Sequence, residues 1–184
     1  MQNTRKNEHE NLKKTVLAAM FLALAYVLPF LTGQIPEIGK MLCPMHIPVL
    51  LCGFICGWQF GLGVGIVAPL LRSLTLGMPV FFPSAVAMAV ELGAYGLIAA
   101  VMHAVLPKKK PFIYCSLLAA MIGGRLIHGA VNFILYGAIG KAYTLSAFIA
   151  GSLTNAIPGI IIQIVFIPPI VMIFEKLTKK NETK

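Results

Sequence analysis

The sequence predicts an all-α integral membrane protein with six transmembrane helices and both termini in the cytoplasm. Of its 184 residues, 58% are apolar and only 11% are charged, which is outside the range of soluble domains. A helix that crosses about 30 Å of hydrocarbon needs roughly 20 apolar residues, so the chain has room for about six such helices in one domain. Short clusters of charge, proline and glycine separate the apolar segments and predict the loops.

The membrane domain is predicted to occupy residues 14–175. Residues 1–13 are polar and have no apolar periodicity, which predicts a cytoplasmic tail, and residues 176–184 form a second, basic tail. The six helices are expected at residues 14–31, 45–57, 60–76, 81–105, 112–137 and 145–174. The basic start and apolar run also resemble a signal peptide, but the run is longer than the roughly 7–15 apolar residues of such a segment, so we expect the first helix to be retained.

Basic residues predict the orientation in the membrane. With six helices, the two tails and the turn at residues 107–111 lie on one side, and they carry almost all the Lys and Arg outside the hydrocarbon. The other side receives only Lys40 and Lys141. By the positive-inside rule we expect both termini on the cytoplasmic side, and we expect the protein to lie in the cell membrane. This topological role also accounts for the net charge of +9, so we do not expect a nucleic-acid partner.

The stretch from Cys43 to Pro79 is the most regular part of the chain. Its glycines recur every fourth residue, at Gly53, Gly57, Gly61 and Gly65. In a helix this spacing lines one face with hydrogen side chains and allows another backbone to approach closely. We interpret the stretch as two short helices joined by a turn at residues 57–59.

Polar residues within the apolar segments are candidates for a binding site. A charge at mid-membrane costs about 2.5–3.5 kcal/mol, so such residues usually face a cavity or a partner. Glu91 and Arg125 lie at similar predicted depths, and the sequence leaves open whether they form a structural ion pair or contact a ligand. Arg125, His128 and Asn132 follow at i, i+3 and i+7, on one face of their helix.

The predicted pocket has further walls. Asn155 is expected at a comparable depth on the last helix, while His46 and Arg72 would meet the cavity from the outer side. Arg72 has the alternative of extending to the membrane surface. His103 is expected at the inner surface without a role. The full set of candidate ligand-binding residues is His46, Arg72, Glu91, Arg125, His128, Asn132 and Asn155.

Enzymatic alternatives have less support. His128-x-x-x-Asn132 resembles one element of membrane-embedded prenyl-protein proteases, but the paired glutamates of those enzymes are missing. The sequence has no Gly-rich loop ending in Gly-Lys-Ser/Thr, so ATP energy must come from partners. Its four cysteines lack the spacing of a metal site, and we expect no metal, no cofactor and no catalytic residues.

Taken together, the chain resembles an S component of the energy-coupling factor (ECF) transporters, which are small vitamin-capturing membrane subunits. The resemblance rests on Ala19-x-x-x-Ala23 in the first helix, the outer loop at residues 32–42, and the run MLCPMHIPVLLCGFICG followed by PLLRS and GMP. It implies that Ala19 and Ala23 dock a transmembrane coupling subunit driven by two ATPases. It also implies that the outer loop caps a small-molecule ligand.

The ligand remains open at this stage. Within the family, the chain resembles the branch that includes predicted pantothenate carriers, so the resemblance makes pantothenate the first hypothesis. Two arginines against one glutamate would suit a carboxylate ligand. A queuosine precursor, a pyridoxine-like compound, a pyrimidine vitamin precursor and riboflavin are alternatives. A self-contained secondary transporter is the main alternative class, although the sequence shows no convincing half-to-half similarity.

Overall fold

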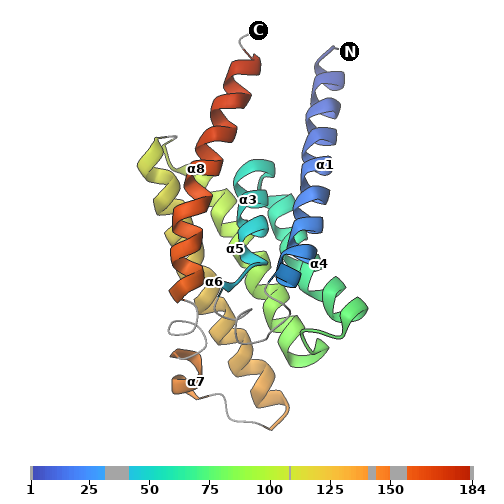
Figure 1. The fold of residues 1–184 in the computed structure, drawn as a ribbon, viewed down its shortest axis with the longest axis vertical. Coiled ribbons are helices and arrows are strands. Elements are labelled where there is room, and N and C mark those ends of the chain that lie inside the picture. Colours follow the sequence, from blue (N-terminus) through green and yellow to red (C-terminus); the bar gives the residue numbers. More distant parts are fainter. Residues whose placement is uncertain (1, 32–41, 108, 141–143, 150–156, 183–184) are drawn as a thin grey trace.

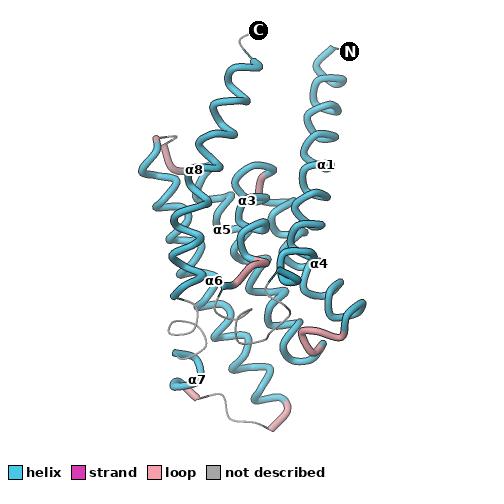
Figure 2. Tube along the Cα trace, viewed as in Figure 1, coloured by secondary structure: helices cyan, strands magenta, loops and turns pink. Residues whose placement is uncertain are grey.

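The structure, a computed structural model, consists of helices joined by loops, without strands, in the part of the chain that it describes (Figures 1 and 2). It describes all residues except 1, 32–41, 108, 141–143, 150–156 and 183–184. The elements are α1 (Gln2–Leu31), α3 (His46–Cys56), α4 (Trp58–Leu76), the short turn η1 (Phe81–Ala85), α5 (Val86–Val105), α6 (Lys110–Ala138), α7 (Leu145–Ile149) and α8 (Ile157–Glu182).

Among the described residues, five helical segments are long and apolar enough to cross a membrane: α1, α4, η1 with α5, α6 and α8. The remaining predicted helix, expected at residues 45–57, corresponds to α3, which is shorter, with 11 residues. The prediction of an all-helical membrane protein with six membrane helices is therefore confirmed. The start of α1 and the end of α8 lie at the same end of the molecule, as an even number of crossings requires (Figure 1).

The outermost helices extend beyond the apolar segments from which they were predicted. α1 begins at Gln2 rather than near residue 14, and α8 continues to Glu182 rather than ending near residue 174. The helix bounds were predicted from apolar segments, which the polar ends of the chain lack. Lys, Arg, Glu and Gln favour helix without apolar periodicity, and Glu10 precedes Lys14 at the favourable i, i+4 spacing. Both extensions project from the bundle in Figure 1.

Two predicted helices are subdivided. The segment expected at 81–105 begins with η1, in which Phe82 has extended backbone angles, and becomes regular from Val86. The segment expected at 145–174 contains the five-residue α7 and then α8, on either side of residues 150–156. The outer loop predicted at 32–42 lies almost entirely outside the described residues.

Helix α5 is the centre of the bundle and packs against α3, α4 and α6. At the crossing with α3 and α4 the backbones almost touch. A Cβ atom added to Gly53 would lie 2.5 Å from the Gly96 carbonyl oxygen, and one added to Gly61 would lie 2.7 Å from the Gly53 Cα. The predicted close approach is thus confirmed, with α5 as the third participant.

Gly57 is the exception in the glycine series, because it forms the break between α3 and α4. Its φ of 98° lies in the region that favours glycine, and α4 begins at the next residue, Trp58. The turn predicted at 57–59 is therefore shorter than expected. The break reverses the chain, so that α3 and α4 present their glycines to the same part of α5.

The remaining helices surround this core. α1 packs on α3 and α4, α6 packs on α5, and α8 packs on α3 and α6. Buried residues of α1, such as Phe21 and Ala25, join the common apolar core with Leu50, Leu92 and Leu117. This arrangement places polar residues of α3, α5 and α6 inside the bundle.

Candidate ligand-binding site

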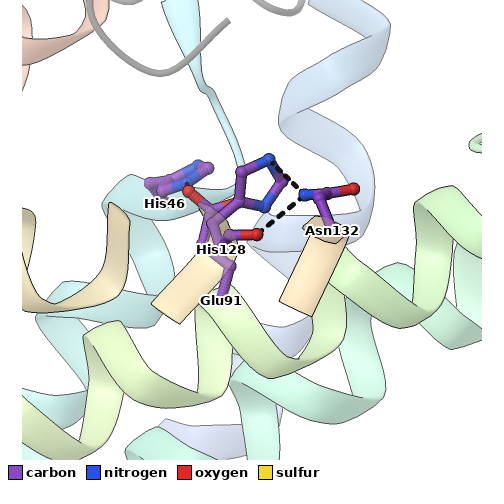
Figure 3. Close-up of polar contacts among 4 residues, drawn as sticks. All are labelled: His46, Glu91, His128 and Asn132. Atoms are coloured by element: carbon purple, nitrogen blue, oxygen red, sulfur yellow. Dashed lines mark hydrogen bonds and ion pairs between the residues drawn. The ribbon is translucent and has the colours of Figure 1, made fainter. Parts of the chain in front are cut away.

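Four polar side chains from three helices meet inside the bundle: His46, Glu91, His128 and Asn132 (Figure 3). His46 is the first residue of α3, Glu91 lies in α5, and the other two lie one turn apart in α6. His46, Glu91 and Asn132 are only 5–6% exposed. We refer to these four residues as the polar cluster.

Asn132 is fully engaged with His128, one turn earlier on the same helix. Its Nδ2 donates to the His128 backbone oxygen at 2.9 Å and lies 2.9 Å from His128 Nε2. The backbone contact fixes the orientation of the amide, because a carbonyl oxygen only accepts hydrogen bonds. His128 Nε2 is therefore the acceptor, and the ring proton of the neutral imidazole is on Nδ1.

Glu91 lies between the two histidines. Its Oε2 is 2.9 Å from His128 Nδ1, an ion-pair distance, although the two groups are not aligned as a hydrogen bond. Its Oε1 is 3.6 Å from His46 Nε2, beyond hydrogen-bond distance. Oε2 is thus the more closely approached carboxylate oxygen, and Oε1 is the more open one.

Tyr95 adds an aromatic wall beside His46. The two rings meet edge to face, with centroids 4.9 Å apart. Tyr95 is completely buried, yet within the described residues its hydroxyl has no hydrogen-bond partner, and neither ring nitrogen of His46 has one. Buried polar groups usually have partners, so this side of the cluster retains unused hydrogen-bonding capacity.

Arg125 is buried on α6, one turn before His128. The described ion pairs of Glu91 are with the two histidines, so the hypothesis of a direct Glu91–Arg125 pair receives no support. Arg125 instead lies near Cys43, just before α3. Burial raises the pKa of the Cys43 thiol to about 11, and the positive charge of the nearby Arg125 guanidinium opposes this increase.

Arg72 lies against α1 and makes different contacts from the polar cluster. Its Nη1 donates to the Tyr26 backbone oxygen at 3.0 Å, and its guanidinium stacks over the Phe30 ring at 5.1 Å. It is only 5% exposed, so its side chain packs against the neighbouring helices rather than projecting away from the protein. The described contacts give Arg72 a role in fastening α4 to the end of α1.

Other predicted residues have varied positions. Ala19 and Ala23 are exposed on α1, whereas Ala18 and Ala25 face the core, so the pair is available to a partner. His103 is not isolated, since its Nε2 lies 3.1 Å from Glu175 on α8. Asn155 lies outside the described residues.

Sequence reasoning missed Tyr95 and Gln163. Tyr95 follows Glu91 by four residues, so it shares a helix face with a residue already singled out, and this signal was available. Gln163 is 1% exposed on α8, and within the described chain its amide has no hydrogen-bond partner. The described residues contain no group of three or more His, Cys, Asp or Glu side chains that could hold a metal ion.

A bundle of membrane-spanning helices around buried, partly unsatisfied polar side chains is typical of a transporter or a binding subunit. The family model of the ECF transporter substrate-specific component matches residues 13–171, and the chain belongs to this family. Searches of curated proteins and of solved structures gave no match.

Membership of the family has direct consequences. The chain is a multi-pass membrane protein that binds a small-molecule substrate and associates with the coupling and ATPase subunits of the ECF module. Its family role is that of a transporter subunit rather than an enzyme. The resemblance seen in the sequence is thereby confirmed, without the identity of the ligand.

Proposed function

We propose that this chain captures a vitamin or vitamin-like small molecule with high affinity for an ATP-driven importer. The observation that carries the proposal is the buried polar cluster, in which His46 and Glu91 Oε1 face each other without a hydrogen bond. Keeping such groups inside a membrane bundle is costly, and a ligand that bonds to them would offset the cost.

Pantothenate is the first ligand to test. It combines hydroxyl and amide groups with a carboxylate, and Arg125 provides a buried guanidinium suited to a carboxylate. The pyridoxine-like, queuosine-precursor, pyrimidine-precursor and riboflavin alternatives share hydroxyl or ring N–H groups with it. Calorimetry with each compound on the purified chain distinguishes them.

The energy for import would come from a coupling subunit with two ATPases. Ala19 and Ala23 support this assignment, because small exposed residues four apart allow a partner helix to approach closely. Exposed apolar neighbours on α1, including Val16 and Met20, would extend the same contact.

Ala23→Trp tests the docking surface. We expect it to abolish transport by the assembled complex while ligand affinity of the isolated subunit stays within about twofold, because the residue points away from the core. Leu118→Trp is the matched control, since Leu118 is also exposed but lies on α6, and it should leave both quantities unchanged. Loss of binding in Ala23→Trp would contradict the assignment.

A secondary transporter is the competing hypothesis, and uptake by the chain alone separates the two. Reconstituted without the module, the subunit should bind ligand but not concentrate it in vesicles under an imposed ion or proton gradient. Concentrative uptake under those conditions would favour the secondary transporter.

A further inference from the structure

The two oxygens of Glu91 have different roles in the polar cluster. Oε2 lies 2.9 Å from His128 Nδ1 in an ion-pair contact that is not aligned as a hydrogen bond, whereas Oε1 lies 3.6 Å from His46 Nε2. Asn132 sets this asymmetry, because its amide occupies His128 Nε2 and so directs the ring proton toward Glu91. Asn132 therefore acts through His128, as a positioning residue.

The open side of the cluster has a definite hydrogen-bonding pattern. A carboxylate oxygen only accepts, while a neutral imidazole and a phenol hydroxyl each donate one hydrogen bond and accept another. Glu91 Oε1, the His46 ring and the Tyr95 hydroxyl provide this combination within one buried region, and the His46 and Tyr95 rings are in contact. A matching ligand group donates to Glu91 and exchanges hydrogen bonds with the other two.

Given the proposed function, on which this step rests, we propose that the Glu91–His46 side is a subsite for a neutral hydroxyl, amide or ring N–H donor of the ligand. A ligand carboxylate does not bind there. It would bring a second negative charge beside Glu91 in a poorly screened interior, and it has no proton to donate. Any carboxylate of the ligand therefore binds away from Glu91.

The premise is testable without a ligand. Nitrogen NMR of histidine-labelled protein, with the signals of His128 identified by their loss in His128→Gln, should show a neutral ring protonated on Nδ1. In Asn132→Leu, which keeps the side-chain size but removes the amide, this single tautomer should be lost. A charged ring, or a proton on Nε2, in the unaltered protein overturns the inference.

The binding test uses pantothenate and pantothenol, in which an alcohol replaces the carboxylate. Glu91→Gln should weaken both probes by the same factor, about tenfold to a hundredfold in calorimetry, since each loses the same charge-assisted bond. Glu175→Gln, the same change at the His103 pair, should leave both affinities unaltered. Thermal unfolding confirms that each variant is folded. If Glu91→Gln does not fold, Asn132→Leu replaces it as the test variant and should weaken the binding of both probes by a smaller factor.

The outcomes separate this inference from the proposed function. Tighter pantothenate binding in Glu91→Gln, with pantothenol unchanged, would place the carboxylate at Glu91 and overturn the inference while leaving the capture function intact. If neither probe binds the unaltered protein, pantothenate is the wrong ligand. The comparison is then made with the molecule retained on purification from native membranes, identified by mass spectrometry. A retained molecule without an O–H or N–H donor overturns the inference. If no molecule is retained, both the inference and the capture function are overturned.

Discussion

Two faces of α5 are both buried, but one is packed without space and the other retains polar groups without hydrogen-bond partners among the described residues. Toward α3 and α4, the face at Leu92 and Gly96 has no room even for a methyl group, and backbone lies directly against backbone. Toward the polar cluster, the face at Glu91 and Tyr95 is equally buried but retains unused hydrogen-bonding groups. One helix thus anchors a rigid scaffold on one side and presents a polar surface on the other.

This difference indicates how the site is kept in position. Side chains that bind a ligand must be held closely even when no ligand is bound, which requires a support that does not adjust. The glycine contacts of α3 and α4 fix the position and rotation of α5. Glu91 and Tyr95 are therefore placed by residues that never touch the site.

The largest effect is expected at the glycine face, from Gly96→Ala. The added Cβ would lie 2.9 Å from the Gly61 Cα and closer still to its carbonyl, and backbone cannot move aside as a flexible side chain can. We expect a loss of about 3 kcal/mol or more in the free energy of unfolding, and little folded protein. Thermal unfolding in detergent measures the effect.

Gly63→Ala is the matched control, because Gly63 lies in α4 with no atom within 4 Å of an added Cβ. Alanine is favoured over glycine within a helix by roughly 0.5–1 kcal/mol, so this variant should be slightly more stable. Equal effects of the two substitutions would show that the close contact does not carry the scaffold.

The sequence predicts the local features of the fold better than the contacts between helices. Apolar length predicted the helices, and the four-residue glycine spacing predicted a close backbone contact, because both depend on local geometry. The partner of that contact, Gly96, was not predicted, since spacing in one helix does not identify which neighbour approaches. The helical ends at Gln2 and Glu182 were missed because polar residues form helix without apolar periodicity.

The site was predicted in composition more than in pairing. His46, Glu91, His128 and Asn132 were all expected around one pocket, and the structure brings these four together. Depth alone suggested that Glu91 could pair with Arg125, but depth does not determine how two helices are rotated, and the described contacts of Glu91 are with histidines. Their role in ligand binding stays a prediction.

An intermediate effect is expected at Gly124 of α6, which packs against Tyr95 on the polar face of α5. A Cβ there would lie 2.6 Å from two atoms of the Tyr95 ring, which is fully buried and has little freedom to move. Gly124→Ala should lower the free energy of unfolding by about 1–3 kcal/mol and weaken ligand binding, because Tyr95 would be displaced against His46. Unfolding and calorimetry on the same sample measure both.

Gly137→Ala provides the control on the same helix, as an added Cβ there meets no atom within 4 Å. It should leave ligand affinity unchanged. If Gly124→Ala lost stability but kept full affinity, the position of Tyr95 would matter to packing alone, and the polar face would not depend on this contact.

The smallest effect is expected from Tyr95→Phe, which removes only the hydroxyl. Within the described residues this buried hydroxyl has no partner, so its removal should leave the ligand-free protein equally stable or more stable. If the hydroxyl bonds to the ligand, affinity should fall by about twofold to tenfold, as expected for a neutral hydrogen bond worth about 0.5–1.5 kcal/mol. The expected signature is therefore unchanged unfolding without ligand together with weaker binding by calorimetry. A destabilised ligand-free variant would instead show that the hydroxyl has a structural partner, and unchanged affinity would assign Tyr95 to the scaffold rather than to the binding surface.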